Sequence, residues 1–271
     1  MTDALLRAVQ DGVTIHDLGR PYFQGMPQSP NHPAYWRALP RRHGDSVRDD
    51  GGSAANDLIF LGTHVGTHID ALAHVSHNGK LYGGEDAVDA GCGGGYERLG
   101  VHTIEPMVRR GILLDVPRAH GKEVLEAAHK ITVEELETTL AAQTTEIRNG
   151  DVVLIRSGWG RKFAEGAPYV GGASGVPGIS EAGAEWLAER NIIAAGADTI
   201  AFEWLPAGAG HSSLPAHRVL LVENGIYIIE ALDLEGLSDA GAHEFTFIMS
   251  PLNFTGATGS PVRPLAVVSH V

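Results

Sequence analysis

Short apolar segments recur along the chain and are separated by polar or glycine-rich stretches. Several of them are apolar at consecutive positions, not at every second one, and this pattern is typical of strands buried on both faces of a sheet. Turn-forming residues bound most of these segments. The pattern predicts strands at residues 14–18, 57–61, 111–115, 151–156, 192–195, 226–231, 245–249 and 264–268.

Helix signals occur between these strands. Thr132 and Glu135 have the spacing of a capping box, in which each side chain bonds the other residue's backbone N–H. Ser180 is the expected N-cap of another helix. Because helices and strands alternate without a flexible linker, the chain is predicted to form one α/β domain over residues 1–271. The predicted helices cover residues 1–10, 132–143, 180–189 and 217–223.

Two stretches show neither the apolar pattern of a helix nor that of a strand. Residues 21–54 are rich in proline, glycine, charged and aromatic side chains, with Tyr35 and Trp36 in the middle. We interpret this stretch as an ordered loop or lid and not as a regular element. Residues 83–95 are predicted to form a second, glycine-rich loop.

Composition argues against several classes of protein. Lys and Arg number 20 against 33 Asp and Glu, which gives a formal charge of −13. This charge repels phosphate backbones and anionic headgroups, so we expect no nucleic-acid and no membrane partner. No apolar run approaches the roughly 20 residues of a membrane helix. The N-terminal residues show no signal-peptide pattern and Cys92 is the single cysteine, so we expect a soluble, cytoplasmic protein.

Four of the 14 histidines fall between residues 64 and 77. Three of them share the segment His64-Val-Gly-Thr-His68-Ile-Asp70-Ala-Leu-Ala-His74. Neutral imidazole and carboxylate are good ligands for zinc, manganese or iron, and two histidines with one aspartate form a common open coordination set. The alternative is that these are ordinary surface or core histidines of a histidine-rich chain.

The spacing of this segment sets a geometric condition for a metal site. In an extended strand His64 and His68 would be about 13 Å apart, too far to share an ion. Gly66 permits a sharp turn between them because it tolerates a positive φ. His68 and Asp70 are two residues apart, so both side chains leave an extended segment on the same side. The sequence therefore predicts that these three groups converge, with His74 one bend further on.

This segment resembles the H-x-G-T-H-x-D-x-P-x-H signature of the cyclase family of metal-dependent hydrolases, which includes bacterial kynurenine formamidase and isatin hydrolase. Every fixed position matches except the proline, which is Leu72 in this chain. That change removes a backbone restraint but no ligand. The resemblance extends to residues 98–103, 109–115, 151–158, 217–221, 230–232 and 255–264.

The resemblance implies a swivelling β/β/α fold with a mixed central sheet flanked by helices. It implies one or two divalent ions, Zn or Mn, with His64, His68 and Asp70 as ligands of the first. Asp70 would bridge to a second ion completed by His217 and Glu230. It also implies a small-molecule substrate, a cyclic or aromatic amide, and a homo-oligomer, either a dimer or a tetramer.

Other residues allow both a functional and a structural interpretation. Glu230 ends an apolar strand, where a carboxylate is costly to bury unless it is paired or binds a metal. His211 competes with His217 as a ligand, and the family pattern favours His217. Phe23 and Trp36 are candidate substrate-binding residues for an aromatic substrate, although ordinary packing explains each equally well.

The predicted reaction is hydrolysis of a carboxamide-type C–N bond in a formamide, lactam or imide by a metal-activated water. His74 is the candidate catalytic residue that takes the water's proton and returns it to the leaving nitrogen. Lactone hydrolysis or cyclisation, which relatives perform, stays open. So do a non-haem iron oxygenase using a two-His-one-carboxylate set and a non-catalytic metal-binding protein.

Overall fold

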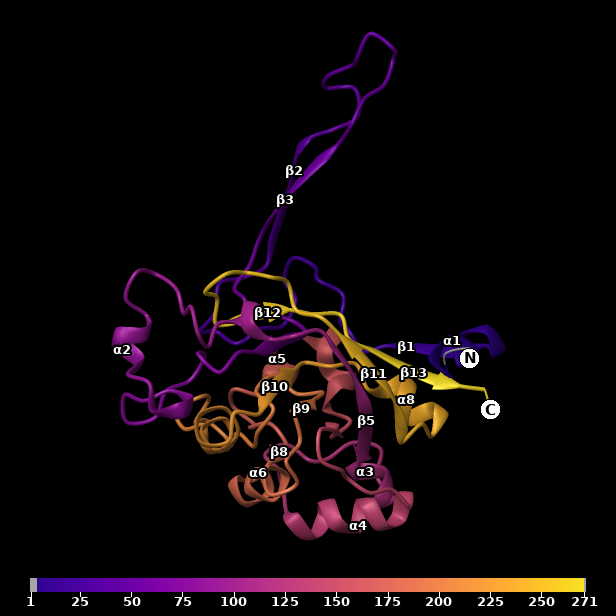
Figure 1. Cartoon of the computed structure of the whole chain (residues 1–271), viewed down its shortest axis with the longest axis vertical. Helices are drawn as coiled ribbons and strands as arrows, with labels where there is room; N and C mark the ends of the chain where they lie inside the picture. The colour runs from indigo at the N-terminus through magenta and orange to yellow at the C-terminus, as the bar shows by residue number, and fades with distance from the viewer. Residues whose placement is uncertain (1–3, 271) are drawn as a thin grey trace.

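A computed structural model describes residues 4–270 of the chain. Its centre is a mixed sheet of nine strands, drawn in Figure 1. The four middle strands β5, β7, β9 and β10 run parallel, and the outer strands pair antiparallel. In spatial order the strands are β1 (Val13–Asp17), β13 (Leu265–Ser269), β11 (Glu244–Met249), β5 (Met107–Asp115), β7 (Val152–Arg156), β9 (Ala194–Ala197), β10 (Tyr227–Glu230), β4 (His68–Asp70) and β12 (Gly259–Pro261).

Helices and short helical turns surround this sheet. α4 and α6 lie together on one of its faces (Figure 1). The helices are α1 (Ala4–Asp11), α2 (Ala87–Ala90), α3 (Val116–Ala119), α4 (Val133–Gln143), α5 (Ala167–Val170), α6 (Glu181–Ala188), α7 (Pro215–His217) and α8 (Glu235–Ala240). Tight turns occur at η1 (Tyr82–Gly84), η2 (Val101–Thr103), η3 (Trp159–Glu165) and the π-helical η4 (Arg218–Glu223). A two-stranded sheet joins β6 (Lys130–Ile131) to β8 (Gly178–Ile179).

The sheet separates two hydrophobic layers. Val153 and Ile155 of β7 pack in the layer that contains α4 and α6, whereas Val152 and Leu154 pack in the opposite layer. All five residues of β7 are buried, as the uninterrupted apolar pattern predicted. Burying each of the four aliphatic side chains of β7 contributes about 1.5–3 kcal/mol. The predicted α/β class with a mixed sheet and flanking helices is confirmed.

Local helix signals also have the predicted geometry. The Thr132 hydroxyl accepts from the Glu135 backbone N–H, and the Glu135 carboxylate accepts from the Thr132 N–H, so α4 begins with a complete capping box. Ser180 caps α6 by accepting from the Gly183 N–H at 3.1 Å. The helix predicted at residues 217–223 is instead the short α7 followed by the π-helical η4.

The interpretation of residues 21–54 as a loop without regular elements is wrong for its middle part. There β2 (Trp36–Arg41) pairs antiparallel with β3 (Asn56–Phe60) in a separate two-stranded sheet. This hairpin projects far from the rest of the molecule (Figure 1). Because every residue of β3 is exposed, the hairpin has no buried face that would impose an alternating pattern. The strand predicted at 57–61 is therefore present but lies outside the main sheet.

A charged cluster closes the carboxyl end of β7. The fully buried Arg156 donates to Asp115 at 2.8 Å and makes two hydrogen bonds to the Glu235 carboxylate at 2.9 Å. Arg161 adds a further ion pair with Glu235. A buried guanidinium needs such partners because removal of its hydration is costly. The cluster fixes α8 against the end of the sheet.

Within residues 4–270, no helix combines the length and apolar composition required to cross a membrane.

Candidate metal centre

The candidate site is built on β4, which lies between β10 and β12 at one end of the sheet. The register places Glu230 directly opposite His68, and Ile228 opposite Asp70. His68 Nε2 lies 3.5 Å from an oxygen of Asp70 and 3.5 Å from an oxygen of Glu230. His68 and Asp70 thus share one side of the strand, as their two-residue spacing predicted.

Two glycines bring His64 to the same place. Gly66 has φ +67°, and a Cβ at this position would lie 2.7 Å from the Tyr22 ring. Gly259 lies on the other side, where a Cβ would be 2.5 Å from the His64 ring. The resulting turn puts His64 Nδ1 2.6 Å from Asp70 Oδ1. The predicted convergence of these side chains is present.

His217 reaches the cluster from α7. Its Nε2 is 3.2 Å from Glu230 Oε1 and 3.7 Å from Asp70 Oδ2. The other ring nitrogen is held by Glu203, whose carboxylate accepts from His217 Nδ1 at 2.6 Å. The same carboxylate accepts from the backbone N–H groups of Ala216 and His217, both at 3.0 Å. In the neutral ring Glu203 therefore keeps the proton on Nδ1, so that Nε2, which faces the carboxylates, can ligate a metal.

His68 is oriented in the same manner by the backbone. Its Nδ1 lies 2.8 Å from the Gly66 carbonyl oxygen, which can only accept a hydrogen bond. In the neutral ring the proton therefore resides on Nδ1, and it is Nε2, facing Asp70 and Glu230, that can ligate a metal. Such outer hydrogen bonds are typical of histidines that ligate metals.

These side chains form two overlapping groups with metal-ligand geometry. His64, Asp70 and His74 offer ligand atoms within 4.8 Å of one another, and so do Asp70, His217 and Glu230. Asp70 is common to both groups. Its Oδ2 is buried and has no hydrogen-bond partner among residues 4–270. A buried carboxylate oxygen without a donor is costly, so a divalent cation fits this position.

The electrostatics of the cluster also fit a cation. Burial opposes charge on His68, but hydrogen bonding to Asp70 and the nearby Glu230 raise its pKa to about 9. Burial acts likewise on His217, where bonds to Glu203 and Glu230 raise the pKa to about 10. Despite burial, neighbouring histidines hold the pKa of Asp70 well below its usual range. The carboxylates thus make this buried site strongly attractive to positive charge.

His74 lies beside the first group. Its ring stacks on that of His64, with centroids 3.7 Å apart. Burial lowers the pKa of His74 to about 3, against the opposing effect of Asp70 and with a further lowering by the other histidines. His74 is therefore neutral at pH 7 and can bind a metal through a ring nitrogen, but the low pKa makes it a weak proton acceptor at this pH.

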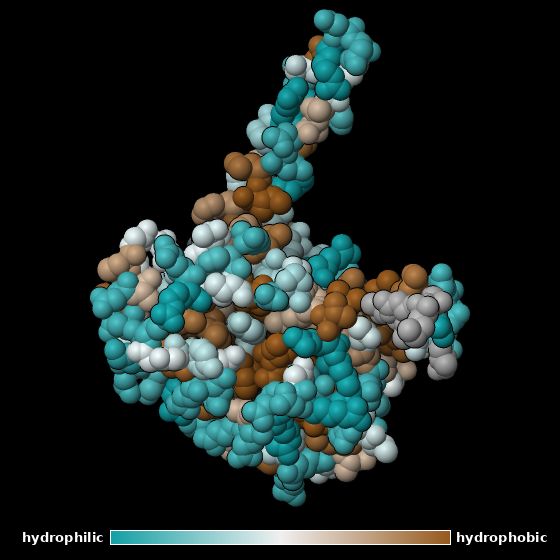
Figure 2. Space-filling view, viewed as in Figure 1, coloured by the Kyte–Doolittle hydropathy of each residue, from teal (hydrophilic) through white to brown (hydrophobic). Residues whose placement is uncertain are grey.

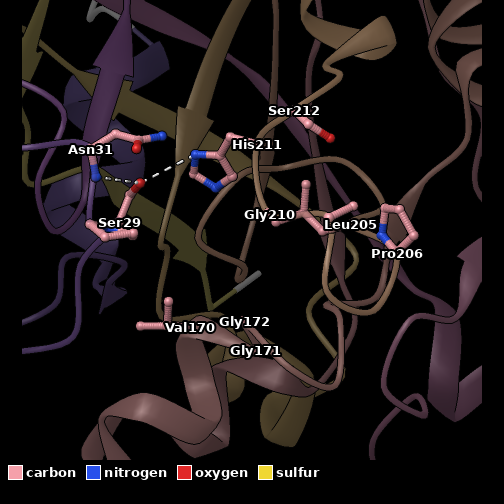
Figure 3. A pocket seen from close by; sticks show the side chains of 12 residues that line it. Ser29, Asn31, Val170, Gly171, Gly172, Leu205, Pro206, Gly210, His211 and Ser212 are labelled. Carbon is pink, nitrogen blue, oxygen red and sulfur yellow. Dashed lines mark hydrogen bonds between the residues drawn. The ribbon is translucent and has the colours of Figure 1, made fainter.

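The cluster opens into a cavity of about 210 Å³. A second cavity of about 430 Å³ adjoins it and shares Ser29, Asn31 and His211 in its wall. Figure 3 shows the bond between Ser29 and His211, 3.2 Å long, at this boundary. His211 thus lines the cavities and belongs to neither metal-ligand group. His64, His68, His74, His217 and Glu230 line the smaller cavity together with His32, Val75, Ile200, Ala201 and Leu214.

The two aromatic candidates lie elsewhere in the described chain. Phe23 packs edge-on against Phe163, with ring centroids 6.4 Å apart. Trp36 begins β2 of the projecting hairpin and is exposed. Neither lines the two cavities.

Three contributors to the site were missed in the sequence. Glu203, which bonds His217, lies 14 residues before it in the chain. Thr258 lies 194 residues after His64, and its hydroxyl is 2.9 Å from His64 Nε2. The His32 ring lies next to that of His64 in a tilted arrangement, with ring centroids 5.4 Å apart. No spacing rule connects such distant positions. A glutamate in the apolar stretch Ala201-Phe-Glu-Trp-Leu205 was the one available signal.

Fold and site together define a mixed α/β protein with a buried centre of histidines and carboxylates. The family model for Cyclase matches residues 16–204, and the chain belongs to this family. It is 28% identical to Cyclase-like protein 3 of Oryza sativa subsp. japonica over 96% of this chain and 82% of that protein. It is 26% identical to isatin hydrolase of Roseibium aggregatum (81% and 77%) and 27% identical to kynurenine formamidase of Bacillus cereus (80% and 81%).

Solved structures show the same fold. A crystal structure described as a novel cyclase has a TM-score of 0.84 and 28% identity, covering 98% of this chain and 93% of that one. Isatin hydrolase A from Ralstonia solanacearum has a TM-score of 0.75 and 22% identity, covering 99% of both chains. The relatives support assignment of this chain as a hydrolase of the cyclase family.

Proposed function

We propose that this chain is a metal-dependent amidohydrolase that cleaves the C–N bond of a small cyclic or aromatic amide, a formamide, lactam or imide. The observation that carries the proposal is the pair of ligand groups sharing Asp70, whose Oδ2 has no hydrogen-bond partner among residues 4–270. Asp70, His217 and Glu230 would hold one divalent ion. His64, His68 and Asp70, the set expected from the sequence, would hold the other, although the ligand group that the structure forms on that side contains His74 and not His68. Zinc and manganese both suit imidazole and carboxylate ligands.

A bound divalent cation would polarise the amide carbonyl and make water a better nucleophile at neutral pH. The chain's own contribution begins with His74, which lines the cavity and is neutral at pH 7. His74 takes the proton of the attacking water and returns it to the leaving nitrogen. Glu203 holds the Nδ1 proton of His217, and the Gly66 carbonyl holds that of His68, so that Nε2 of each ring stays available to a metal.

The dimensions of the cavities support a small substrate. Pockets for drug-sized ligands occupy about 300–1,000 Å³. The chamber at the metal centre, about 210 Å³, is smaller and admits one ring or a short acyl group. The adjoining chamber of about 430 Å³ accommodates the remainder of a substrate. Isatin hydrolase and kynurenine formamidase, by their names, act on small aromatic compounds, and this fits the same size class.

The test is a hydrolysis screen with metal-free and reloaded protein. Chelated protein, and the same protein reloaded with Zn²⁺ or Mn²⁺, is offered N-formylanilines, cyclic imides and isatins, with lactones as a separate arm. We expect metal-restored cleavage of at least one amide class. Cleavage of lactones alone would reassign the bond, and oxygen consumption with Fe²⁺ would reassign the chemistry. Amide cleavage by the metal-free protein at the full rate would contradict the proposal.

A further inference from the structure

The larger of the two cavities beside the metal centre, about 430 Å³, is called here the outer chamber, and the smaller, about 210 Å³, the inner chamber. His64, His68, His74, His217 and Glu230 line the inner chamber. An amide that reacts beside these residues places its scissile bond in the inner chamber. The outer chamber then receives the part of the substrate beyond that bond, and its walls determine which chemical groups this part can carry.

The outer chamber is polar where it meets the inner one. Ser29, Asn31 and His211 line both chambers. Ser29 is buried, and its hydroxyl oxygen lies 3.2 Å from His211 Nδ1 and accepts from the Asn31 backbone N–H at 3.4 Å. These contacts hold the His211 ring so that its other nitrogen, Nε2, points into the outer chamber (Figure 3). A neutral imidazole donates at one nitrogen and accepts at the other, so Nε2 offers one hydrogen bond to a substrate.

The remaining walls of the outer chamber are apolar or lack side chains. Leu205 and Pro206 lie across it from Ser29 and Asn31, and Val170 lines a third side (Figure 3). Among residues 4–270, no Lys, Arg, Asp or Glu lines this chamber. The uncharged lining is particular to the chamber, because 20% of the chain's residues are charged and hydrophilic side chains cover much of the body's surface in Figure 2.

This lining limits the charge that a substrate can bring. A carboxylate in the outer chamber would exchange its hydration for walls that, within residues 4–270, contain no Lys or Arg, and unpaired burial of a charge is costly. An ammonium group would likewise meet no carboxylate in the described part of the wall. His211 does not supply the missing positive charge at pH 7, because burial lowers the pKa of its ring from an ordinary value of about 6.5.

We propose, on the basis of the amide hydrolysis proposed above, that the outer chamber selects substrates whose part beyond the scissile amide is uncharged. This part carries a neutral hydrogen-bonding group, such as a carbonyl, an ether or a second amide, which binds His211 Nε2 and the Asn31 side chain. Its apolar remainder packs against Leu205, Pro206 and Val170. Amides with a carboxylate or an α-amino-acid tail are disfavoured, and His211 determines this specificity without taking part in bond cleavage.

The experiment compares two N-formylanilines that carry either a carboxamide or a carboxylate at the meta position, with unsubstituted N-formylaniline as the reference. The two substituents have the same shape and differ in charge. The kcat and KM of the metal-loaded protein are measured for each compound, and alkaline hydrolysis without protein corrects for intrinsic reactivity. We expect kcat/KM to be at least about tenfold higher for the carboxamide, mainly through a lower KM, because the carboxylate is buried without a partner.

Two variants connect this preference to the outer chamber. His211→Phe keeps a ring but removes the hydrogen bond, and should cut the advantage of the carboxamide over unsubstituted N-formylaniline at least about fivefold. Val170→Arg adds a cation to the wall and should reverse the preference in favour of the carboxylate. The matched controls are His243→Phe and Val133→Arg, at partly buried positions that line neither chamber, and they should leave both ratios unchanged.

Failure of this proposal and failure of the proposed hydrolysis give different results. Equal cleavage of the two substituted compounds, faster cleavage of the carboxylate, or a ratio that His211→Phe and its control alter equally overturns the proposal and leaves the hydrolysis intact. If neither compound is cleaved, formamide hydrolysis fails, and calorimetric titration of both compounds into the metal-loaded protein decides the specificity. Tighter binding of the carboxamide supports the proposal, and equal or absent binding overturns it. Circular dichroism checks that each variant folds, and the wild-type ratio decides the proposal where Val170→Arg does not fold.

Discussion

Replacing Glu203 with glutamine tests how the chain positions a proposed metal ligand. The carboxylate accepts three hydrogen bonds, from the N–H groups of Ala216 and His217 and from His217 Nδ1. An amide of the same size has one acceptor oxygen and one NH₂ donor. If the NH₂ faces His217, the ring must take the other tautomer, and Nε2 then carries a proton towards Glu230. If the NH₂ group faces Ala216, the buried backbone N–H of Ala216 loses its acceptor.

Both orientations carry a cost of known size. Loss of an acceptor for a buried donor costs about 1–3 kcal/mol. Loss of an outer-shell partner of a metal-binding histidine lowers metal affinity about 10- to 100-fold. We therefore expect Glu203→Gln to weaken binding of one equivalent of Zn²⁺ or Mn²⁺ by about 10- to 100-fold. The other equivalent, on the His64 side of Asp70, should bind nearly unchanged.

The assay is a titration of metal-free protein against a competing chelator, with isothermal calorimetry for stoichiometry. Glu135→Gln is the matched control, since Glu135 also accepts from a histidine, His129, at 2.8 Å and from a backbone N–H, but outside the site. That variant should lose stability without losing metal affinity. Equal affinities for both equivalents in Glu203→Gln and wild type, or an equal loss in Glu135→Gln, would refute the positioning role.

Three further variants test other parts of the account. His68→Ala removes an imidazole 3.5 Å from both Asp70 and Glu230 and should abolish activity and reduce bound metal; retention of full metal content would show the assignment to be wrong. His74→Ala should slow turnover about 10²–10⁴-fold while metal stays bound, and loss of the metal would make His74 a ligand. Burial alone would raise the pKa of the Glu235 carboxyl, but Arg156 and Arg161 lower it below its usual value. The ionised carboxylate therefore stabilises the fold above the unfolded pKa of about 4.3, and this stabilisation is lost as the pH falls through the folded pKa. Urea unfolding of Glu235→Gln should therefore show a deficit at pH 7 that shrinks in acid, whereas a deficit independent of pH would contradict this.

The sequence predicted best those features that local chemistry determines. Continuous apolar runs such as β7 indicate a sheet buried on both faces, and the spacing of Thr132 and Glu135 predicts the start of α4. The turn at Gly66 and the two-residue spacing of His68 and Asp70 were sufficient to predict that these side chains converge with His64. Each signal lies within a few residues and needs no tertiary information.

The features that were missed depend on tertiary structure. β2 has no buried face, so its side chains carry no alternation by which to recognise a strand. β12 is three residues long and exists because β4 pairs with it. Glu203 and Thr258 act on His217 and His64 across the fold, and their positions in the chain say nothing about that proximity.

The most direct measurement is the anomalous diffraction of crystals grown with Zn²⁺, collected on both sides of the zinc absorption edge. We expect an anomalous peak about 2.0–2.2 Å from an Asp70 oxygen, with the nitrogen of at least one of His64, His68 and His217 at a similar distance. A second peak on the Glu230 side of Asp70 would correspond to the second ligand group. Zinc bound elsewhere, with no anomalous density beside Asp70, would contradict the account.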